Sequence, residues 1–440
     1  TSWRESASRP RVIADPKHPD QCLDVTISIP TELPTARPDF LAVPPAPTAF
    51  SGAILPWYSD KKHSNPALRD RVPAPDGSRI GINIQCPRDT VDDYVGLICR
   101  EAELARALLP NSCAITTLWL RGSPSRQFSP EAVTELIFRL NSQFPLTVPG
   151  AVRGVELSAT ALSAERLALL AGLGFNRIGL RVDATLGSDE RSLGRIDAMQ
   201  RQLADFASLA VSYEVIFGSQ SHPRYLARLL AALRSFPAVS IELKDAREGM
   251  PQALEDRRET GHLLTSTLTA MTAAGWHTYG NHLYAPPESP LARAGAAGPL
   301  RLTPWGPQPI EQRLWLGLGI GAFGYRHPAY YRNTASAADY RAALRDRQLP
   351  DKVIYRVPAE RAQALDVTQS LLCHHEVARD AAPGFCEELR HDGLLETTAH
   401  TYRLTPTGVA QLSAILDRLH RQAVSGDDHG TTQNHVRRDR

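Results

Sequence analysis

Hydrophobic and polar residues follow two alternating periods between residues 79 and 275. Period-two runs predict β-strands at residues 79–85, 115–120, 152–157, 176–182, 211–217 and 238–243. Patterns of the helical period predict helices between them at residues 90–108, 129–143, 163–173, 189–208, 222–235 and 252–275. Strand-then-helix repetition implies a parallel sheet with right-handed crossovers. We therefore predict an α/β fold, an incomplete TIM-like (β/α)6 barrel with its chemistry at the carboxyl ends of the strands.

The sequence predicts that the chain has four parts. Residues 1–78 are rich in proline, which excludes long helices and predicts an extended arm. Residues 79–345 form the barrel domain. Residues 346–421 predict a helical, winged-helix-like domain, because a short strand at 402–404 precedes a helix capped by Thr405. Residues 422–440 are polar and predict a disordered tail.

Composition excludes several classes of partner. The chain has 440 residues and a net charge of +2, so we expect no nucleic-acid partner, and we interpret the winged-helix-like domain as a packing module. No apolar run reaches the roughly 18 residues that a membrane span requires. The N-terminal residues contain no apolar signal region, so we expect a cytoplasmic protein with no membrane partner.

Cysteine spacing argues against a metal site. The six cysteines are scattered at positions 22, 86, 99, 113, 373 and 386, and no two have the spacing of a zinc or redox pair. His374 and His375 are adjacent and would point to different faces of a helix, so we expect no metal there. Cys86 ends the first predicted strand, where a neighbouring arginine and the following helix would lower the pKa of a nucleophilic thiol.

Several segments resemble one protein family over about residues 79–420. These are residues 80–86 (IGINIQC), 118–125 (LWLRGSPS), 155–159 (VELSA), 174–183 (GFNRIGLRVD), 316–324 (LGLGIGAFG) and 330–340 (YYRNTASAADY). They are similar to motifs of the oxygen-independent coproporphyrinogen III oxidases, a branch of the radical-SAM (radical S-adenosylmethionine) superfamily. The resemblance implies the radical-SAM barrel and its C-terminal domain. Relatives in this branch include enzymes that build azabicyclic, aziridine-containing natural products.

This sequence departs from the family pattern at the residues with which the family binds its cluster and SAM. The family holds a [4Fe-4S] cluster with Cys-x3-Cys-x2-Cys, whereas Cys86 is the only one of these cysteines present here. Each cluster iron needs its own thiolate, so we expect no cofactor, neither the iron–sulfur cluster nor SAM. Arg121 replaces a glycine of the family, Asp183 its SAM-contacting glutamine and Glu214 its aspartate, whereas Glu156 and Arg195 are retained.

Charged residues at the predicted strand ends are the candidate site, because buried charges are costly unless paired or used. The alternative is that they form structural ion pairs. The candidate catalytic residues are Glu156, Asp183, Glu214 and His282. The candidate substrate-binding residues are Arg121, Ser123, Arg181, Arg195, Lys244, Tyr284, Cys86 and Arg88. Carboxylates could hold an amine and accept its proton, and the cations could bind an anionic leaving group.

These residues predict a cluster-less radical-SAM-scaffold enzyme that acts on a small charged metabolite without redox change. The best hypothesis is intramolecular displacement or ring closure, of the aziridine or azabicycle type, with loss of an anionic leaving group. Three alternatives stay open: a haem- or porphyrin-binding protein with His282 or Cys86 as axial ligand, a non-catalytic partner of another protein subunit, and coproporphyrinogen III oxidase-like activity if a cluster is present.

Overall fold

The structure is a computed structural model. It describes residues 77–87, 89–122, 124–146, 148–185, 190–218, 221–246, 254–280, 282–298, 300–303, 306–309, 314–326, 329–356, 362–419 and 421–422. The chain divides into two units, Thr1–Thr35 and Ala36–Arg440, and all described residues belong to the second. The predicted N-terminal arm lies outside the described residues up to residue 76, and so does the predicted tail beyond residue 422.

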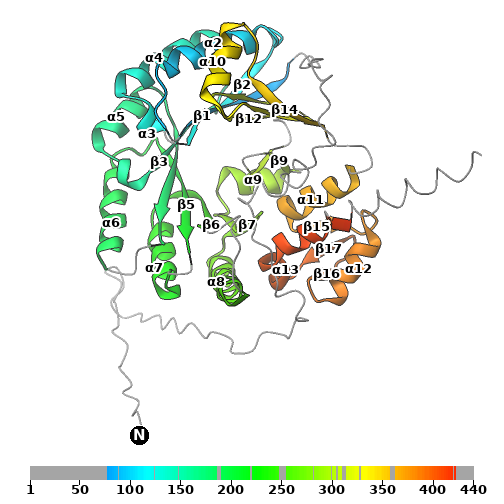
Figure 1. Cartoon of the computed structure of the whole chain (residues 1–440). Coiled ribbons are helices and arrows are strands. Elements are labelled where there is room, and N and C mark those ends of the chain that lie inside the picture. The colour runs from blue at the N-terminus through cyan, green and yellow to red at the C-terminus, as the bar shows by residue number, and fades with distance from the viewer. Residues whose placement is uncertain are drawn as a thin grey trace, which may run out of the picture. The chain divides into compact units, whose positions relative to one another are not determined.

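All six predicted strands are present. They are β1 (Arg79–Cys86), β2 (Ala114–Gly122), β3 (Val152–Ser158), β4 (Arg177–Asp183), β5 (Ala210–Phe217) and β6 (Ala238–Asp245). The six predicted helices are also present, as α2 (Tyr94–Arg106), α4 (Pro130–Gln143), α5 (Ala164–Gly172), α6 (Glu190–Ala204), α7 (Pro223–Arg234) and α8 (Leu254–Ala273). A short helix, α3 (Pro124–Gln127), and the 3-10 turn Ala159–Ala161 complete this part (Figure 1).

The six strands pair in chain order and in parallel, from β1 to β6. A later strand, β11 (Leu314–Leu318), pairs in parallel with the other edge of β1. The whole sheet has twelve strands in the order β14-β13-β12-β11-β1-β2-β3-β4-β5-β6-β8-β7. The mixed α/β fold and its parallel sheet are therefore confirmed. Closure into a barrel is not shown by the described strand pairs and stays a prediction.

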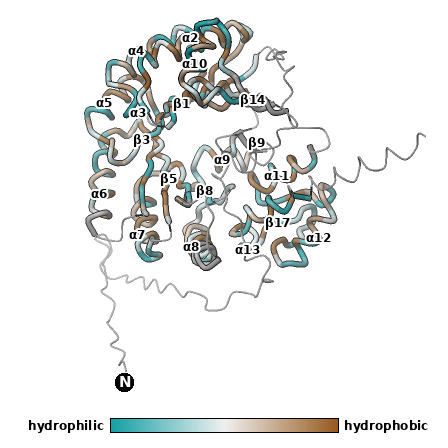
Figure 2. The backbone as a smooth tube through the Cα atoms, in the orientation of Figure 1, coloured by the Kyte–Doolittle hydropathy of each residue, from teal (hydrophilic) through white to brown (hydrophobic). Residues whose placement is uncertain are grey.

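Burial alternates along β5, where Val211, Tyr213, Val215 and Phe217 are buried and the residues between them are half-buried. We call the side of the sheet that carries these buried residues the core face and the other side the inner face. On β1 the side chains of Ile80, Ile82 and Ile84 are fully buried, and burial of each contributes about 1.5–3 kcal/mol relative to exposure. Helices α4 to α7 lie along one side of the strands, and Figure 2 shows hydrophobic and hydrophilic positions alternating along them. Serine caps begin α4 and α5: Ser129 accepts from Ala132 N at 3.2 Å, and Ser163 accepts from Arg166 N at 3.2 Å.

The later part of the sheet is antiparallel. It consists of β7 (His277–Tyr279), β8 (Leu283–Ala285), β12 (Phe323–Arg326), β13 (Ala329–Asn333) and β14 (Asp351–Arg356). A separate pair joins β9 (Leu300–Thr303) to β10 (Gly306–Pro309), and the helices are α9 (Pro290–Ala297) and α10 (Ala337–Arg345).

The C-terminal residues form helices around a small antiparallel sheet. The helices are α11 (Ala362–His374), α12 (Pro383–His391) and α13 (Pro406–Ala410); the strands are β15 (Glu376–Ala378), β16 (Leu395–Thr397) and β17 (Thr401–Leu404). Thr405 caps α13 as predicted, by accepting from Gly408 N at 3.1 Å. This part contacts the rest through Gly280 N, which donates to Leu372 O at 2.7 Å. The winged-helix interpretation and the domain boundaries stay predictions. No helix among the described residues has the length and apolarity of a membrane span.

Candidate functional site

Six charged side chains gather on the inner face near the carboxyl ends of β2 to β6. Strand register places Arg181 opposite Glu214, and Glu214 opposite Glu242. The full set is Arg121, Glu156, Arg181, Glu214, Glu242 and Lys244, which we call the charged cluster. Its three cations balance its three carboxylates. Five of the six residues are sequence-predicted site residues, and the structure brings them together; their roles stay predictions.

Glu156 on β3 is held by β2. Arg121 Nη1 donates to Glu156 Oε1, and Gly122 N donates to Glu156 Oε2 at 2.9 Å. The Arg121 guanidinium also lies 4.9 Å from the centre of the Trp119 ring, a cation–π arrangement that fixes its plane. Gly122 has φ 85°, and a Cβ there would lie 2.2 Å from Cys86 O. Glycine is therefore required at this turn, because both its backbone conformation and the close approach of β1 exclude a side chain.

Glu214 on β5 is held by cations from both neighbouring strands. Arg181 Nε donates to Glu214 Oε1 at 2.7 Å, and Lys244 Nζ donates to Glu214 Oε2 at 2.6 Å. Glu242 is the sixth member, which sequence reasoning missed; Lys244 Nζ lies 3.5 Å from Glu242 Oε2. Its signal was present, because Ser240, Glu242 and Lys244 alternate with buried residues along β6.

The pKa values of Glu214 and Glu242 are shifted in opposite directions. Burial raises the pKa of Glu214, but Lys244 and Arg181 outweigh burial and hold that pKa below its ordinary value. Burial dominates at Glu242, assisted by the charge of Glu214, and raises the pKa of Glu242 despite Lys244. Burial disfavours the Lys244 cation, but Glu242 and Glu214 outweigh it and raise the pKa of Lys244. The site therefore pairs a firmly ionised carboxylate with one whose proton is held more tightly.

Asp183 and Arg195 lie apart from these ion pairs. Asp183 Oδ1 accepts from Thr185 N at 2.9 Å and from Thr185 Oγ at 2.5 Å, which is a local turn beyond β4. Arg195 is an exposed residue of α6. The structure does not join either residue to the charged cluster, and a role for them stays a prediction.

His282 and Tyr284 are also placed elsewhere. His282 O accepts from Leu243 N at 3.0 Å, and burial together with nearby His375 lowers the pKa of His282 to about 4. Tyr284 is fully buried, and its register partner on β6 is the core residue Ile241. Directly opposed residues of an antiparallel pair share a face, so the Tyr284 side chain lies on the core face.

Cys86 has the surroundings of a core residue. It is 1% exposed and shares the parity of Ile80, Ile82 and Ile84. Burial, followed by the charge of Glu156, raises the pKa of Cys86 far above its ordinary value. The expectation of a lowered thiol pKa is therefore wrong, because desolvation exceeds any stabilisation by the helix that follows. Arg88 and Ser123 lie outside the described residues.

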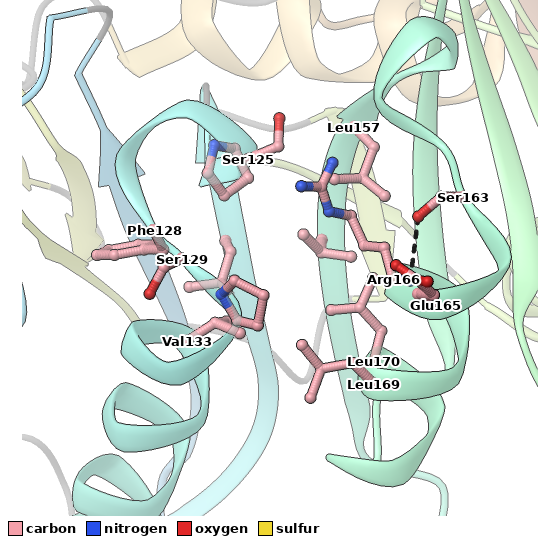
Figure 3. A pocket seen from close by; sticks show the side chains of 14 residues that line it. Ser125, Phe128, Ser129, Val133, Leu157, Ser163, Glu165, Arg166, Leu169 and Leu170 are labelled. Carbon is pink, nitrogen blue, oxygen red and sulfur yellow. Dashed lines mark hydrogen bonds between the residues drawn. The ribbon is translucent and has the colours of Figure 1, made fainter.

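A cavity of about 240 Å³ lies on the opposite side of the sheet from the charged cluster. Its walls include core-face residues Leu120, Val155 and Leu157 of β2 and β3. Figure 3 shows the Arg166 side chain extending along the cavity toward Ser125, and both residues line it. Arg166 Nη1 donates to Ala161 O at 2.6 Å. The cavity and the charged cluster are thus separate features.

The described cysteines do not fit a three-cysteine cluster site. Cys86 ends β1, whereas Cys99 is buried within α2 and Cys113 precedes β2. The described residues contain no group of three histidine, cysteine or acidic side chains able to hold one metal ion.

Comparison with solved structures identifies the fold. The chain superposes on the structure titled "Coproporphyrinogen III oxidase (HemN) from Escherichia coli is a Radical SAM enzyme" with a TM-score of 0.65 and 16% identity, over 79% of this chain and 91% of that one. The chain therefore has a HemN-like fold. No protein-family model and no curated protein match the chain.

Two other structures match far less well. N-acetylneuraminate lyase from Mycoplasma synoviae has a TM-score of 0.25 and 9% identity, over 37% of this chain and 54% of that one. A putative lyase/mutase from Burkholderia cenocepacia has a TM-score of 0.20 and 13% identity, over 46% and 82%. These scores support no structural argument.

The expectation that the chain needs no cofactor is contradicted by this fold. The HemN structure is titled a radical-SAM enzyme, and SAM and an iron–sulfur cluster belong to the chemistry of that class. The expectation rested on two missing cysteines, and this likeness shows that it was wrong.

Proposed function

We propose that the chain is an enzyme on a HemN-like scaffold that catalyses a redox-neutral displacement or ring closure on a small charged metabolite. The substrate carries an amine and an anionic leaving group such as sulfate or phosphate. The nitrogen attacks the carbon that bears the leaving group, which closes an aziridine or azabicyclic ring. The observation that carries the proposal is the charged cluster, which presents three cations and three carboxylates on one face of the sheet near the strand ends.

Location supports a reacting site rather than a set of surface ion pairs. The carboxyl ends of parallel strands are where α/β barrels and open α/β sheets bind ligands. The side chains of Glu156, Glu214 and Lys244 are only 20–24% exposed. The six charges already neutralise one another, and a ligand that carries both signs of charge can exchange partners with them without leaving an uncompensated charge.

Chemistry supports the same substrate class. Arg181 is 53% exposed, so its guanidinium can reach a ligand while its Nε holds Glu214. A guanidinium matches the oxygens of sulfate or phosphate bidentately, and stabilising the charge on a leaving oxygen lowers the barrier to displacement. The carboxylates provide the complementary place for an amine.

The test is release of the leaving group. The full chain, as purified and after anaerobic treatment with iron and sulfide, is incubated with sulfate and phosphate monoesters of short amino alcohols and hydroxy amino acids. The expected result is free sulfate or phosphate together with a cyclic amine, in equal amounts. The matched control is E396Q, which changes an exposed glutamate of β16 and should leave release unchanged, whereas R181M should lower it at least tenfold. Absence of release from every ester in both preparations would refute the proposal.

Radical chemistry is the second candidate, favoured by the superposition on 91% of the HemN chain. Its test uses the same iron-treated preparation, with iron counting, SAM and a reductant, and with coproporphyrinogen III as substrate. Formation of 5′-deoxyadenosine and loss of carboxyl groups would select this candidate over the first. Haem binding and a role as partner of another subunit stay predictions, tested by titration with haem near 400 nm and by co-purification.

A further inference from the structure

The three carboxylates of the charged cluster differ in how well their oxygens are partnered. Both oxygens of Glu156 accept hydrogen bonds, from Arg121 and from Gly122 N. Both oxygens of Glu214 also accept hydrogen bonds, from Arg181 and Lys244 at 2.7 and 2.6 Å. Lys244 and Arg181 hold the pKa of Glu214 below its ordinary value, so Glu214 is poorly suited to accept a proton.

Glu242 has the weakest partner of the three. Lys244 Nζ is 3.5 Å from Glu242 Oε2 and 0.9 Å closer to Glu214 Oε2 (3.5 minus 2.6 Å). The groups that act on Glu242 are Lys244 on its own strand, Glu214 on β5 and Arg121 on β2, whereas its register partner on β8 is the uncharged Leu283. The Glu242 side chain is 29% exposed, so a bound molecule can reach it.

The different partners separate the proton affinities of two adjacent carboxylates. The pKa of Glu242 lies above its ordinary value and that of Glu214 below it. Neighbouring titratable groups whose environments move their pKa values apart mark the division between a proton acceptor and a fixed charge. A base with a raised pKa accepts a proton more readily near neutral pH than an ordinary carboxylate does.

We propose that Glu242 is the catalytic base of the ring closure, and that Glu214 positions Lys244 and Arg181 without exchanging protons. This inference rests on the proposed function and deepens it. A substrate ammonium group gives one proton to a Glu242 oxygen. The nitrogen lone pair then forms the new C–N bond while the C–O bond to the sulfate or phosphate breaks. The leaving group departs with the bonding electrons beside Arg181, so no oxidant or reductant is needed.

The first arm of the test measures the proton affinity of Glu242 without any substrate. The full chain is labelled with ¹³C at glutamate carboxyls and titrated by NMR, and the resonance missing from E242Q is assigned to Glu242. The expected midpoint lies above the ordinary value of about 4.3, and the resonance missing from E214Q should titrate below that value. A midpoint at or below the ordinary value for Glu242 would overturn the proposal, whether or not a substrate is known.

The second arm uses whichever amino alcohol sulfate or phosphate the enzyme turns over. E242Q should lower kcat by about 10²–10⁴-fold, the contribution typical of a general base, and should leave KM within threefold. The acid limb of the wild-type pH profile should disappear in E242Q and reappear in E242D. A fall of less than tenfold, or an unchanged acid limb, would overturn the role of Glu242. If the wild-type protein turns over no ester, the proposed function fails. A raised midpoint for Glu242 in the first arm would then show only a tightly held proton, and the assignment of Glu242 as catalytic base would fail with the proposed function.

Discussion

Glu101 should be among the most sensitive polar positions of the described chain. It is 1% exposed on α2 and accepts hydrogen bonds from three parts of the sequence. Gly319 N donates to Oε2 at 2.7 Å, Tyr340 OH to Oε2 at 2.5 Å and Asn333 Nδ2 to Oε1 at 2.6 Å. The carboxylate therefore joins α2 to the turn after β11, to the end of β13 and to α10.

The magnitude follows from the geometry of the E101Q substitution. A glutamine has one carbonyl oxygen, so its best orientation keeps the hydrogen bonds from Gly319 N and Tyr340 OH. Its amide nitrogen then faces Asn333 Nδ2, and because both groups are donors the third hydrogen bond is lost. Losing one buried hydrogen bond costs about 1–3 kcal/mol, and the two remaining bonds change from charge-assisted to neutral. Removal of a buried charge offsets part of this cost. We expect a net loss of about 2 kcal/mol in the free energy of unfolding.

The assay is urea unfolding followed by far-UV circular dichroism, with hydrogen exchange at the amides of Gly319 and Ile320 as a local readout. E103Q is the matched control, because Glu103 is exposed on the same helix, and its change should stay within about 0.5 kcal/mol. Y340F and the double variant complete a mutant cycle, with an expected coupling energy above about 0.5 kcal/mol. An E101Q protein as stable as E103Q, with unchanged exchange at Gly319, would refute the reasoning.

Three further predictions concern packing, thiols and pH. G317A should lose about 1–3 kcal/mol, because its Cβ would lie 2.3 Å from Phe323 O; G194A, in α6 with no atom within 4 Å of its Cβ, should be neutral or stabilising, and the same urea assay compares them. Cys113 should react with an alkylating reagent in the native protein before buried Cys86 does, as peptide mass spectrometry would show, and equal rates would contradict the burial. Burial lowers the pKa of His282 and of His375 to about 4 from an unfolded value of about 6.5. The unfolded state then binds more protons between these values, so stability should be complete above about pH 6.5 and fall toward pH 4, by up to about 1.4 kcal/mol per pH unit for each histidine; H282Q should reduce the slope, and an unchanged slope would contradict the assignment.

The sequence predicts the first half of the fold because its elements are locally encoded. Each strand from β1 to β6 packs against its crossover helix. The strand therefore shows a period-two hydrophobic pattern and the helix shows a helical one, and both patterns can be read from the sequence. The parallel pairing of β11 with β1 was not predicted, because it joins residues more than 230 positions apart. In that pairing the Trp315 ring lies so close to Gly81 that a Cβ on Gly81 would be 2.5 Å from it. Such a contact depends on two distant residues together, and neither reveals it alone.

The sequence predicted where the charged residues gather but not which of them form ion pairs with one another. Charged residues at strand ends indicated the right region, but the residue types could not show which charges neutralise each other. Register decides this, since Arg181, Glu214 and Glu242 form one row across three strands. Asp183, two residues beyond Arg181, turns back to Thr185 instead. Cys86 was misjudged because its parity on β1 places it among the core isoleucines.

The balance of charge in the cluster leads to a last prediction, which rests on the proposed function. Three cations and three carboxylates sum to zero, so a ligand of either sign alone leaves the site with a net charge in a partly desolvated place. A ligand with both signs exchanges partners with the existing ion pairs and leaves the sum unchanged. Ethanolamine O-sulfate, whose ammonium and sulfate charges sum to zero, should therefore bind at least tenfold more tightly than sulfate or ethanolamine in calorimetric titrations of the full chain. K244M leaves a net negative cluster and should weaken the binding of sulfate and strengthen the binding of ethanolamine. Equal affinities of wild type and K244M for all three compounds would show that the cluster does not form the binding site.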